Sequence, residues 1–148
     1  MIAELILSSF ALAASITSFI ISFIQTNKNA KIELKSKFFD TIFNEYLIKR
    51  IPLARKKIMF NSTSHKLQDT DELIEVLRSM RIDSLYFEYN DKRFYIELKK
   101  ALQQLEDYIT NAEDKEMSGE EQTDFLNDLQ KHISLIYKII EGQYTGKR

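Results

Sequence analysis

Five positively charged residues lie within nine positions around the chain's one proline, Pro52. Clustered guanidinium and ammonium groups form charge-assisted hydrogen bonds with phosphate, so this basic cluster can bind an anionic ligand. Such a ligand would be a phosphorylated molecule or a nucleic acid, and a nucleotide or an oligonucleotide is an example. Contact with lipid headgroups, or simple solubility, also accounts for the charges, and the sequence leaves these alternatives open. The basic cluster consists of Lys49, Arg50, Arg55, Lys56 and Lys57.

Arginine is interleaved with aromatic residues in a second stretch, residues 78–95. Aromatic rings beside arginine can stack on the bases of a nucleic acid. At helical spacing, however, such rings more often form a hydrophobic core with charged edges, and we favour that interpretation. The stretch contains Arg78, Arg81, Tyr86, Phe87, Tyr89, Arg93, Phe94 and Tyr95.

No grouping of residues in the sequence is typical of catalysis or of a bound metal. The two histidines, His65 and His132, are far apart and have no carboxylate cluster at ligand spacing. There is no cysteine, and the three glycines do not form a glycine-rich phosphate loop. Adjacent acidic residues such as Glu106 and Asp107 point to different sides of a helix, so we expect them on the solvated surface. We therefore predict a protein that is not an enzyme and has no metal or cofactor.

An uncharged stretch of twenty residues, Leu5 to Ile24, occupies the beginning of the chain. At about 1.5 Å per residue, a helix of this length reaches about 30 Å, the thickness of the hydrocarbon core of a bilayer. The stretch therefore predicts a transmembrane helix. Residues 11–13 resemble a signal-peptidase site, but the residues before them carry Glu4 and no basic group, so we do not expect cleavage.

Small and polar residues recur along this span at alternating intervals of four and three, which places them on one face of the helix. In lipid, small residues allow helices to approach closely, and hydroxyl groups can hydrogen-bond across an interface or face water. This seam predicts either a helix–helix interface or the wall of a pore. A lone anchor is the alternative, since Ser9 and Thr17 are polar and lie off the seam. The seam consists of Glu4, Ser8, Ala11, Ser15, Ser18, Ser22 and Gln25.

Basic residues follow the span, and none precedes it. By the positive-inside rule, the lysines at 28, 31, 35 and 37 place the N-terminus outside and the remaining residues in the cytoplasm. We therefore predict a single-pass protein of the inner (plasma) membrane. Residues 1–60 carry nine Lys/Arg and four Asp/Glu, a net charge of +5, whereas residues 61–148 carry twelve and eighteen, a net charge of −6. Base near the span and acid away from it are expected for a domain beside anionic lipid.

The composition predicts an all-α protein, because three glycines and one proline leave little material for β-turns. We divide the 148 residues into a transmembrane helix over residues 1–26, membrane-proximal helices over residues 27–60, and a helical bundle over residues 61–148 that completes the cytoplasmic domain.

Helix boundaries are predicted from proline, glycine and capping residues. We expect a break or kink at Pro52, then a short helix to about Phe60 and a loop over residues 61–64. Further expected boundaries are a cap formed by Asp69 and Glu72, a break at Asn90-Asp91 that also caps the next helix, a capping box formed by Ser118 and Glu121, and an end at Gly142.

Apolar residues at helical spacing predict which side of each cytoplasmic helix faces the core. The first predicted stripe is Phe39, Ile42, Phe43, Tyr46 and Leu47, followed by Leu53, Ile58, Met59 and Phe60. The second is Leu73, Leu77, Met80 and Phe87, with Ile74 and Leu85 beside them. The third is Phe94, Leu98, Ala101, Leu102, Leu105 and Ile109, and the fourth is Phe125, Leu129, Ile133, Ile136 and Ile140.

One N-terminal span followed by a compact cytoplasmic helical domain resembles the membrane effectors of bacterial anti-phage defence, in particular the Hailong-type membrane effector. The resemblance covers the architecture of the whole chain and includes no specific motif. It implies an oligomeric ion channel that is controlled by a signal made by a nucleotidyltransferase.

Two hypotheses follow from the sequence. The first is a homo-oligomeric effector in the lipid bilayer, whose cytoplasmic bundle controls a pore lined by the seam. The second is a membrane-anchored adaptor or scaffold whose bundle recruits a cytoplasmic protein partner while the span only anchors it.

Overall fold

The computed structural model describes residues 18–26, 28–29, 32–33 and 36–145, and the chain divides into two compact units between Phe38 and Phe39. In the first unit, residues 18–26 are helical, and the rings of Phe19 and Phe23 stack with their centroids 6.5 Å apart. Within the described ranges, no helix has both the length and the hydropathy needed to cross a membrane. The first 17 residues of the predicted span lie outside these ranges.

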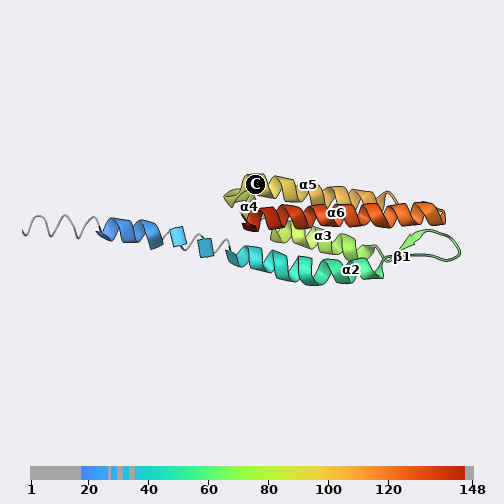
Figure 1. The fold of residues 1–148 in the computed structure, drawn as a ribbon, viewed down its shortest axis with the longest axis horizontal. Coiled ribbons are helices and arrows are strands. Elements are labelled where there is room, and N and C mark those ends of the chain that lie inside the picture. The colour runs from blue at the N-terminus through green and yellow to red at the C-terminus, as the bar shows by residue number, and fades with distance from the viewer. Residues whose placement is uncertain (1–17, 27, 30–31, 34–35, 146–148) are drawn as a thin grey trace, which may run out of the picture. The chain divides into compact units, whose positions relative to one another are not determined.

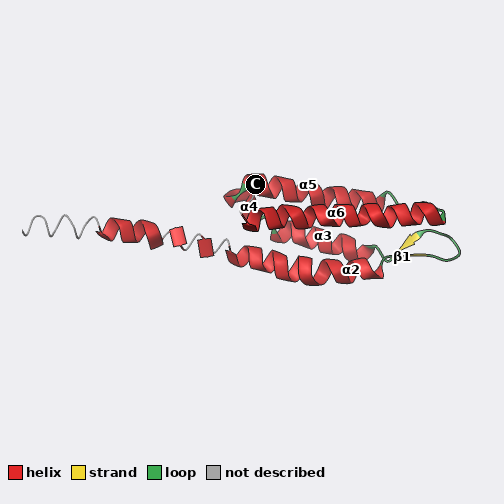
Figure 2. Cartoon of the chain, in the orientation of Figure 1, coloured by secondary structure: helices red, strands yellow, loops and turns green. Residues whose placement is uncertain are grey.

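The second unit is built almost entirely from helices, which confirms the predicted all-α class. Figure 1 shows α3, α5, α6 and the helix that contains α2 side by side, and contacts join α5 to both α3 and α6. The predicted fold lacked a short antiparallel hairpin, β1–β2, which Figure 2 marks at one end of the bundle. The elements are η1 (Ile42–Arg50), α2 (Ile51–Lys57), β1 (Met59–Phe60), β2 (Leu67–Gln68), α3 (Asp71–Asp83), α4 (Tyr86–Asn90), α5 (Lys92–Thr110) and α6 (Gly119–Thr145).

Of the predicted break or kink at Pro52, the break is wrong, because η1 passes directly into α2, and what changes next to the proline is the type of helix. Ile51, the residue before the proline, keeps helical dihedral angles of −62° and −49°. Its N–H bonds to the carbonyl of Tyr46, five residues earlier, so η1 is a π-helix. In an α-helix the ring of Pro52 would clash with the carbonyl four residues before it, and the wider π-turn relieves that clash.

In the π-helix, one backbone carbonyl has no hydrogen-bond donor within the helix itself. Five residues before Pro52 is Leu47, and a proline has no N–H to donate to its carbonyl. The hydroxyl of Tyr137 on α6 donates to that carbonyl instead. Leu47 is buried, so a carbonyl without a partner there would be costly. Tyr137 therefore ties α6 to the helix that begins the bundle.

The predicted apolar stripes form the core with a few exceptions. Phe39 belongs to an aromatic cluster, with its ring centroid 5.0 Å from that of Phe87 and 5.2 Å from that of Phe94. All predicted residues of the third and fourth stripes are buried. Four predicted core residues are exposed instead: Phe43, Leu53, Met59 and Leu85.

The short helix predicted to run to Phe60 ends earlier, at Lys57. Ile58 adopts an extended conformation, with ψ of 122°, and the chain enters the hairpin. The hairpin turn falls in the predicted loop, where the side-chain oxygen of Asn61 accepts hydrogen bonds at 2.8 Å from the N–H groups of both Thr63 and Ser64. Asparagine forms such turns readily, and this local bonding competes with the helix.

Two of the predicted helix caps are confirmed. The N–H of Ser118 donates to Glu121 at 2.7 Å, and the N–H of Glu121 donates back to the Ser118 hydroxyl at 3.4 Å. Hydrogen bonding from Ser118 to the Glu121 carboxyl, chiefly from the backbone N–H, lowers the pKa of that carboxyl because it favours the charged form. Asp91 caps α5 by accepting a hydrogen bond at 3.3 Å from the N–H of Phe94.

Two other predicted boundaries are wrong, and one boundary was not predicted. The helix expected to start with a cap from Asp69 and Glu72 begins at Asp71, after Thr70, whose hydroxyl donates to Glu113 near the α5–α6 connection. That helix is also divided: α3 ends at Asp83, and α4 follows a turn. Gly142 does not end the last helix, because α6 continues to Thr145.

A long-range contact accounts for the extension of α6. The side-chain amide of Gln143 donates to Asp91, which lies at the start of α5. This bond secures the turn that follows Gly142, so the glycine stays within the helix.

A double-mutant cycle tests the role of Tyr137. In the wild-type background, Tyr137→Phe leaves the Leu47 carbonyl without a donor, and we expect it to lower the free energy of unfolding by about 1–3 kcal/mol. In the Pro52→Ala background, an alanine N–H is available to the same helix, so the cost of Tyr137→Phe should fall by at least half. Denaturant titration of the full chain measures both. Equal costs in the two backgrounds would show that Pro52 does not create the need for Tyr137.

Candidate anion-binding pocket

A pocket of about 570 Å³ lies between α2 and α6 in the second unit. Pro52 and the apolar side chains of Ile51 and Ile133 form part of its wall. None of its lining residues, all within the described ranges, is acidic. Its polar lining consists of Arg55 and Lys56 from α2, and Gln130, Ser134, Tyr137 and Lys138 from α6.

Arg55 is a positively charged pocket residue for which the described fold provides no hydrogen-bond or ion-pair partner at Nε. Its Nε is buried and has no hydrogen-bond partner in the described part of the chain, where no carboxylate forms an ion pair with the side chain either. Burial lowers the pKa of the Arg55 guanidinium, because desolvation disfavours the charged form. The guanidinium nevertheless keeps its charge, since an arginine pKa starts far above neutral pH. An anion in the pocket would supply the missing partner.

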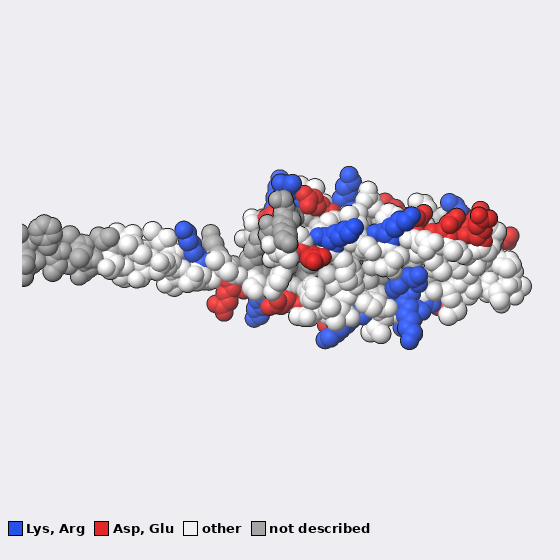
Figure 3. Space-filling model, in the orientation of Figure 1, with Lys and Arg blue, Asp and Glu red and all other residues white. Residues whose placement is uncertain are grey.

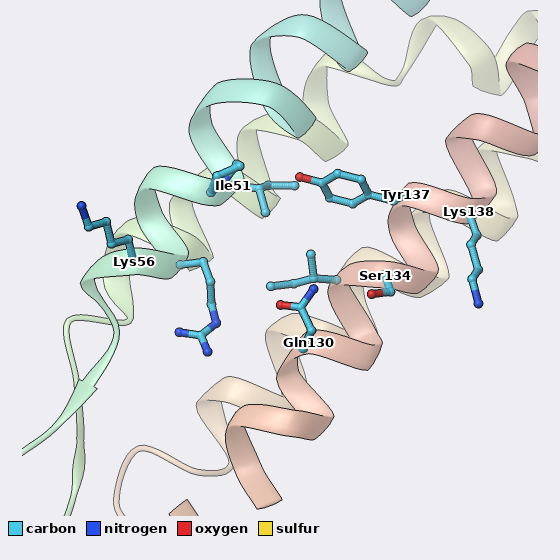
Figure 4. Close-up of a pocket in the computed structure, with 9 residues that line it drawn as sticks. Ile51, Lys56, Gln130, Ser134, Tyr137 and Lys138 are labelled. Atoms are coloured by element: carbon cyan, nitrogen blue, oxygen red, sulfur yellow. The ribbon is translucent and has the colours of Figure 1, made fainter. Parts of the chain in front are cut away.

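The remaining polar groups differ in how they are directed. Figure 4 shows Gln130 and Ser134 on the same side of the pocket, with the Gln130 amide directed toward α2. Lys56 and Lys138 lie at opposite edges, with their ammonium groups pointing outward. Gln130 and Ser134 can donate hydrogen bonds to an oxyanion. The lysine side chains are long enough to turn toward an oxyanion that has bound in the pocket.

Tyr137 connects this pocket to η1. Burial raises the pKa of its hydroxyl, which therefore remains protonated and able to donate at neutral pH. That hydroxyl holds the Leu47 carbonyl, and Figure 4 shows it directed toward Ile51. A ligand in the pocket would lie against the group that ties α6 to η1.

The structure separates the basic cluster predicted from the sequence. Only Arg55 and Lys56 line the pocket. Lys49 forms an ion pair with Glu45 at 3.8 Å, and Lys57 forms one with Glu72.

Arg50, another member of the predicted basic cluster, does not line the pocket. The guanidinium of Arg50 lies 5.1 Å from the centre of the Tyr46 ring, where the two form a cation–π contact away from the pocket.

Sequence reasoning missed Lys138, which comes to the pocket from another helix. Its place directly beside Tyr137 on the polar edge of the α6 stripe was the one local signal.

The predicted seam falls mostly outside the described residues. Ser18, Ser22 and Gln25 lie in the helix over residues 18–26, where they are exposed. The other seam residues lie outside the described ranges: Glu4, Ser8, Ala11 and Ser15.

The stretch of arginines and aromatic residues contributes to the core, as we favoured. Phe87 and Phe94 are buried and pack edge-to-face, with centroids 4.9 Å apart. Arg78 and Arg81 both pair with Glu106, at 2.8 Å and 3.1 Å. The expectation that Glu106 is a solvated surface residue is wrong, because its side chain is only 14% exposed and is held by the two arginines.

The described residues contain no group of three or more His, Cys, Asp or Glu side chains placed to hold a metal ion. His132 contacts the Tyr108 ring, with the two ring centres 4.9 Å apart. No protein-family model matches the sequence, and comparisons with curated proteins and with solved structures find no significant match.

Two arginine substitutions distinguish a binding group from a structural one. Arg55→Met removes a charge without a partner, so we expect the unfolding free energy to stay within about 0.5 kcal/mol of wild type or to rise. Arg81→Met leaves Glu106 with one partner fewer and should cost about 1–3 kcal/mol. Denaturant titration of the full chain measures both changes.

Added pyrophosphate should stabilise the wild type and Arg81→Met but not Arg55→Met, because only a pocket with its guanidinium binds the anion. If Arg55→Met destabilises the bundle as much as Arg81→Met, Arg55 has a structural role and the pocket loses its central group.

Proposed function

We propose that this chain is a homo-oligomeric, single-span protein of the inner membrane, and that it forms a pore controlled by its cytoplasmic bundle. The pore is lined by the seam, and the controlling signal is a nucleotide or an oligonucleotide whose phosphate binds in the α2–α6 pocket. The biological role is that of an effector in bacterial antiviral defence, as the resemblance in architecture suggests.

The observation that carries the ligand part of this proposal is Arg55. A partly buried guanidinium whose buried Nε has no partner among the described residues is unfavourable for the free protein, and bound phosphate would supply that partner. The pocket provides two further neutral donors and two mobile lysines, a set that suits several phosphate oxygens. Its volume of about 570 Å³ is within the usual range for small-molecule sites.

A continuous helix supports control of the span by the pocket. The pocket lies on α2, which is the direct continuation of η1, and the chain enters η1 from the segment that follows the predicted span. Tyr137 lines the pocket and also holds the Leu47 carbonyl. Ligand binding that moves α6 relative to α2 would therefore act on the helix leading to the membrane.

The seam supports an oligomer rather than a lone anchor. A single helix cannot enclose a pore, so several copies must bring the same face together, and closed symmetry is the usual arrangement. Glu4 at the outer end of that face would place a ring of carboxylates at the mouth, which favours cations.

The adaptor remains the second candidate, because the bundle exposes apolar side chains that a protein partner can cover. Ile82, Tyr89 and Ile96 are 64%, 87% and 52% exposed. Under this alternative the span inserts and the bundle recruits a partner, but no ion flux occurs.

Ion flux through reconstituted vesicles tests the pore and its seam. We expect the wild type to conduct, and Ser15→Leu/Ser18→Leu to insert but to lose conductance, because leucine removes the small polar surface. The matched control is Ser9→Leu/Thr17→Leu, which makes the same kind of change off the seam and should conduct normally. Loss of conductance in both double variants, or in neither, would exclude the seam as the pore wall.

The same vesicles test the pocket. A short DNA oligonucleotide and a nucleoside triphosphate serve as probes, and either one should change the flux of the wild type but not of Arg55→Met. Arg81→Met, if it folds, is the matched control and should respond like the wild type. The adaptor would be favoured if the wild type inserts but conducts neither in these vesicles nor in cells, whether or not the cells are infected with phage.

A further inference from the structure

The exposed surface of η1, α2 and β1, which we call the outer face, carries several large apolar side chains. Ile48 at the end of η1 and Leu53 on α2 are 56% and 61% exposed, and Met59 in β1 is 55% exposed. Sequence periodicity had predicted a buried position for Leu53 and Met59. Water solvates such side chains poorly, so a face of this kind favours contact with another apolar phase.

Lysines flank Leu53 on the helix. Leu53, Lys56 and Lys57 have the spacing of neighbours on one side of an α-helix, and Lys49 precedes Leu53 by four residues. Figure 4 shows the ammonium group of Lys56 directed away from α6, on the outer side of α2. Figure 3 shows Lys and Arg side chains over the middle of the bundle, and Asp and Glu gathered at the end where α5 joins α6.

Two carboxylates also face this surface, and both are held weakly. Glu45 pairs with Lys49, and Glu72 pairs with Lys57. The four side chains are 43–66% exposed, and ion pairs that are open to water contribute little to stability. A phosphate group that approaches from outside can therefore replace either carboxylate.

We propose that this outer face of η1 and α2 docks onto the surface of an anionic lipid bilayer. Leu53, Ile48 and Met59 enter the boundary between headgroups and acyl chains, and Lys49, Lys56 and Lys57 contact lipid phosphates. Apolar residues flanked by lysine are typical of helices that lie in a membrane interface. A nucleic-acid backbone would satisfy the lysines but would offer the three protruding apolar side chains no place to be buried.

The two parts of the basic cluster then have separate tasks. Arg55 lines the pocket with residues of α6, while Lys49 and Lys57 do not line it, are 66% and 59% exposed, and are assigned to the membrane-docking surface. Lys56 lies at the edge between them. The docking surface requires neither conduction nor a ligand in the pocket, so it can fail or succeed independently of the proposed function.

Site-specific fluorescence tests the docking surface directly. The natural chain has no cysteine, so Leu53→Cys and Ile96→Cys each provide a single attachment site for an environment-sensitive dye. Both positions are exposed and apolar, and Ile96 lies on α5, which makes it the matched control. The full-length chain is reconstituted in vesicles of phosphatidylcholine, with or without phosphatidylglycerol.

We expect the dye at position 53 to be shielded from an aqueous quencher only in anionic vesicles, and the dye at position 96 to stay accessible in both. High salt should reverse the shielding, because it screens the lysines. Equal accessibility at both positions would overturn the proposal. So would a dye at position 53 that is shielded by added oligonucleotide but not by anionic lipid.

Charge removal provides a quantitative second measurement. In the Leu53→Cys background, Lys49→Gln/Lys57→Gln should lower the ratio of docked to free bundle about 25-fold, because each lysine near an anionic surface contributes roughly a factor of five. The matched control is Lys99→Gln/Lys100→Gln on α5, which should leave the ratio unchanged. Equal effects of the two double variants would overturn the assignment of this face, since net charge alone would then account for docking.

Discussion

A proline inside an unbroken helix is the constraint on which the rest of the bundle depends. Pro52 cannot donate to the helix ladder, and η1 accommodates it by taking a π-helical register. That register leaves the Leu47 carbonyl for Tyr137, so α6 must lie against η1 with its tyrosine in place. The same placement of α6 beside α2 creates the pocket that Arg55 lines. Helix geometry, helix packing and the candidate site thus follow from one missing N–H group.

Three arginines in the bundle illustrate the difference between a charge that is paired within the fold and one that is not. Arg81 and Arg78 share the shielded carboxylate of Glu106, and this arrangement joins α3 to α5. Arg55 is also partly buried but has no such carboxylate among the described residues. A charge without a partner lowers stability, and the phosphate that we propose for the pocket would supply the partner that the described fold does not. This asymmetry distinguishes the α2–α6 pocket from the other hollows of the surface.

The core was predictable because helical periodicity reports which side of a helix is buried. Leu98, Leu102 and Leu105 on α5 follow that rule, as does the stripe of α6. Local capping was predictable where the partners are three residues apart, as for Ser118 and Glu121. The failures involve partners that are distant in sequence: Thr70 bonds to Glu113, and Gln143 bonds to Asp91. The pocket was half predictable for the same reason, since no local pattern shows that Lys138 will lie near α2.

The bond between Tyr137 and Leu47 joins residues that are 90 positions apart, and this separation has a consequence for biosynthesis. A ribosome makes the N-terminal stretch and η1 first and α6 last. The first helix of the bundle therefore leaves the exit tunnel before the tyrosine that bonds to its Leu47 carbonyl exists, and water must hydrogen-bond to that carbonyl until α6 has been made. A nascent chain that stops before α6 can form helices, but it has neither the pocket nor the bond that completes η1. Closure of the bundle thus waits for α6.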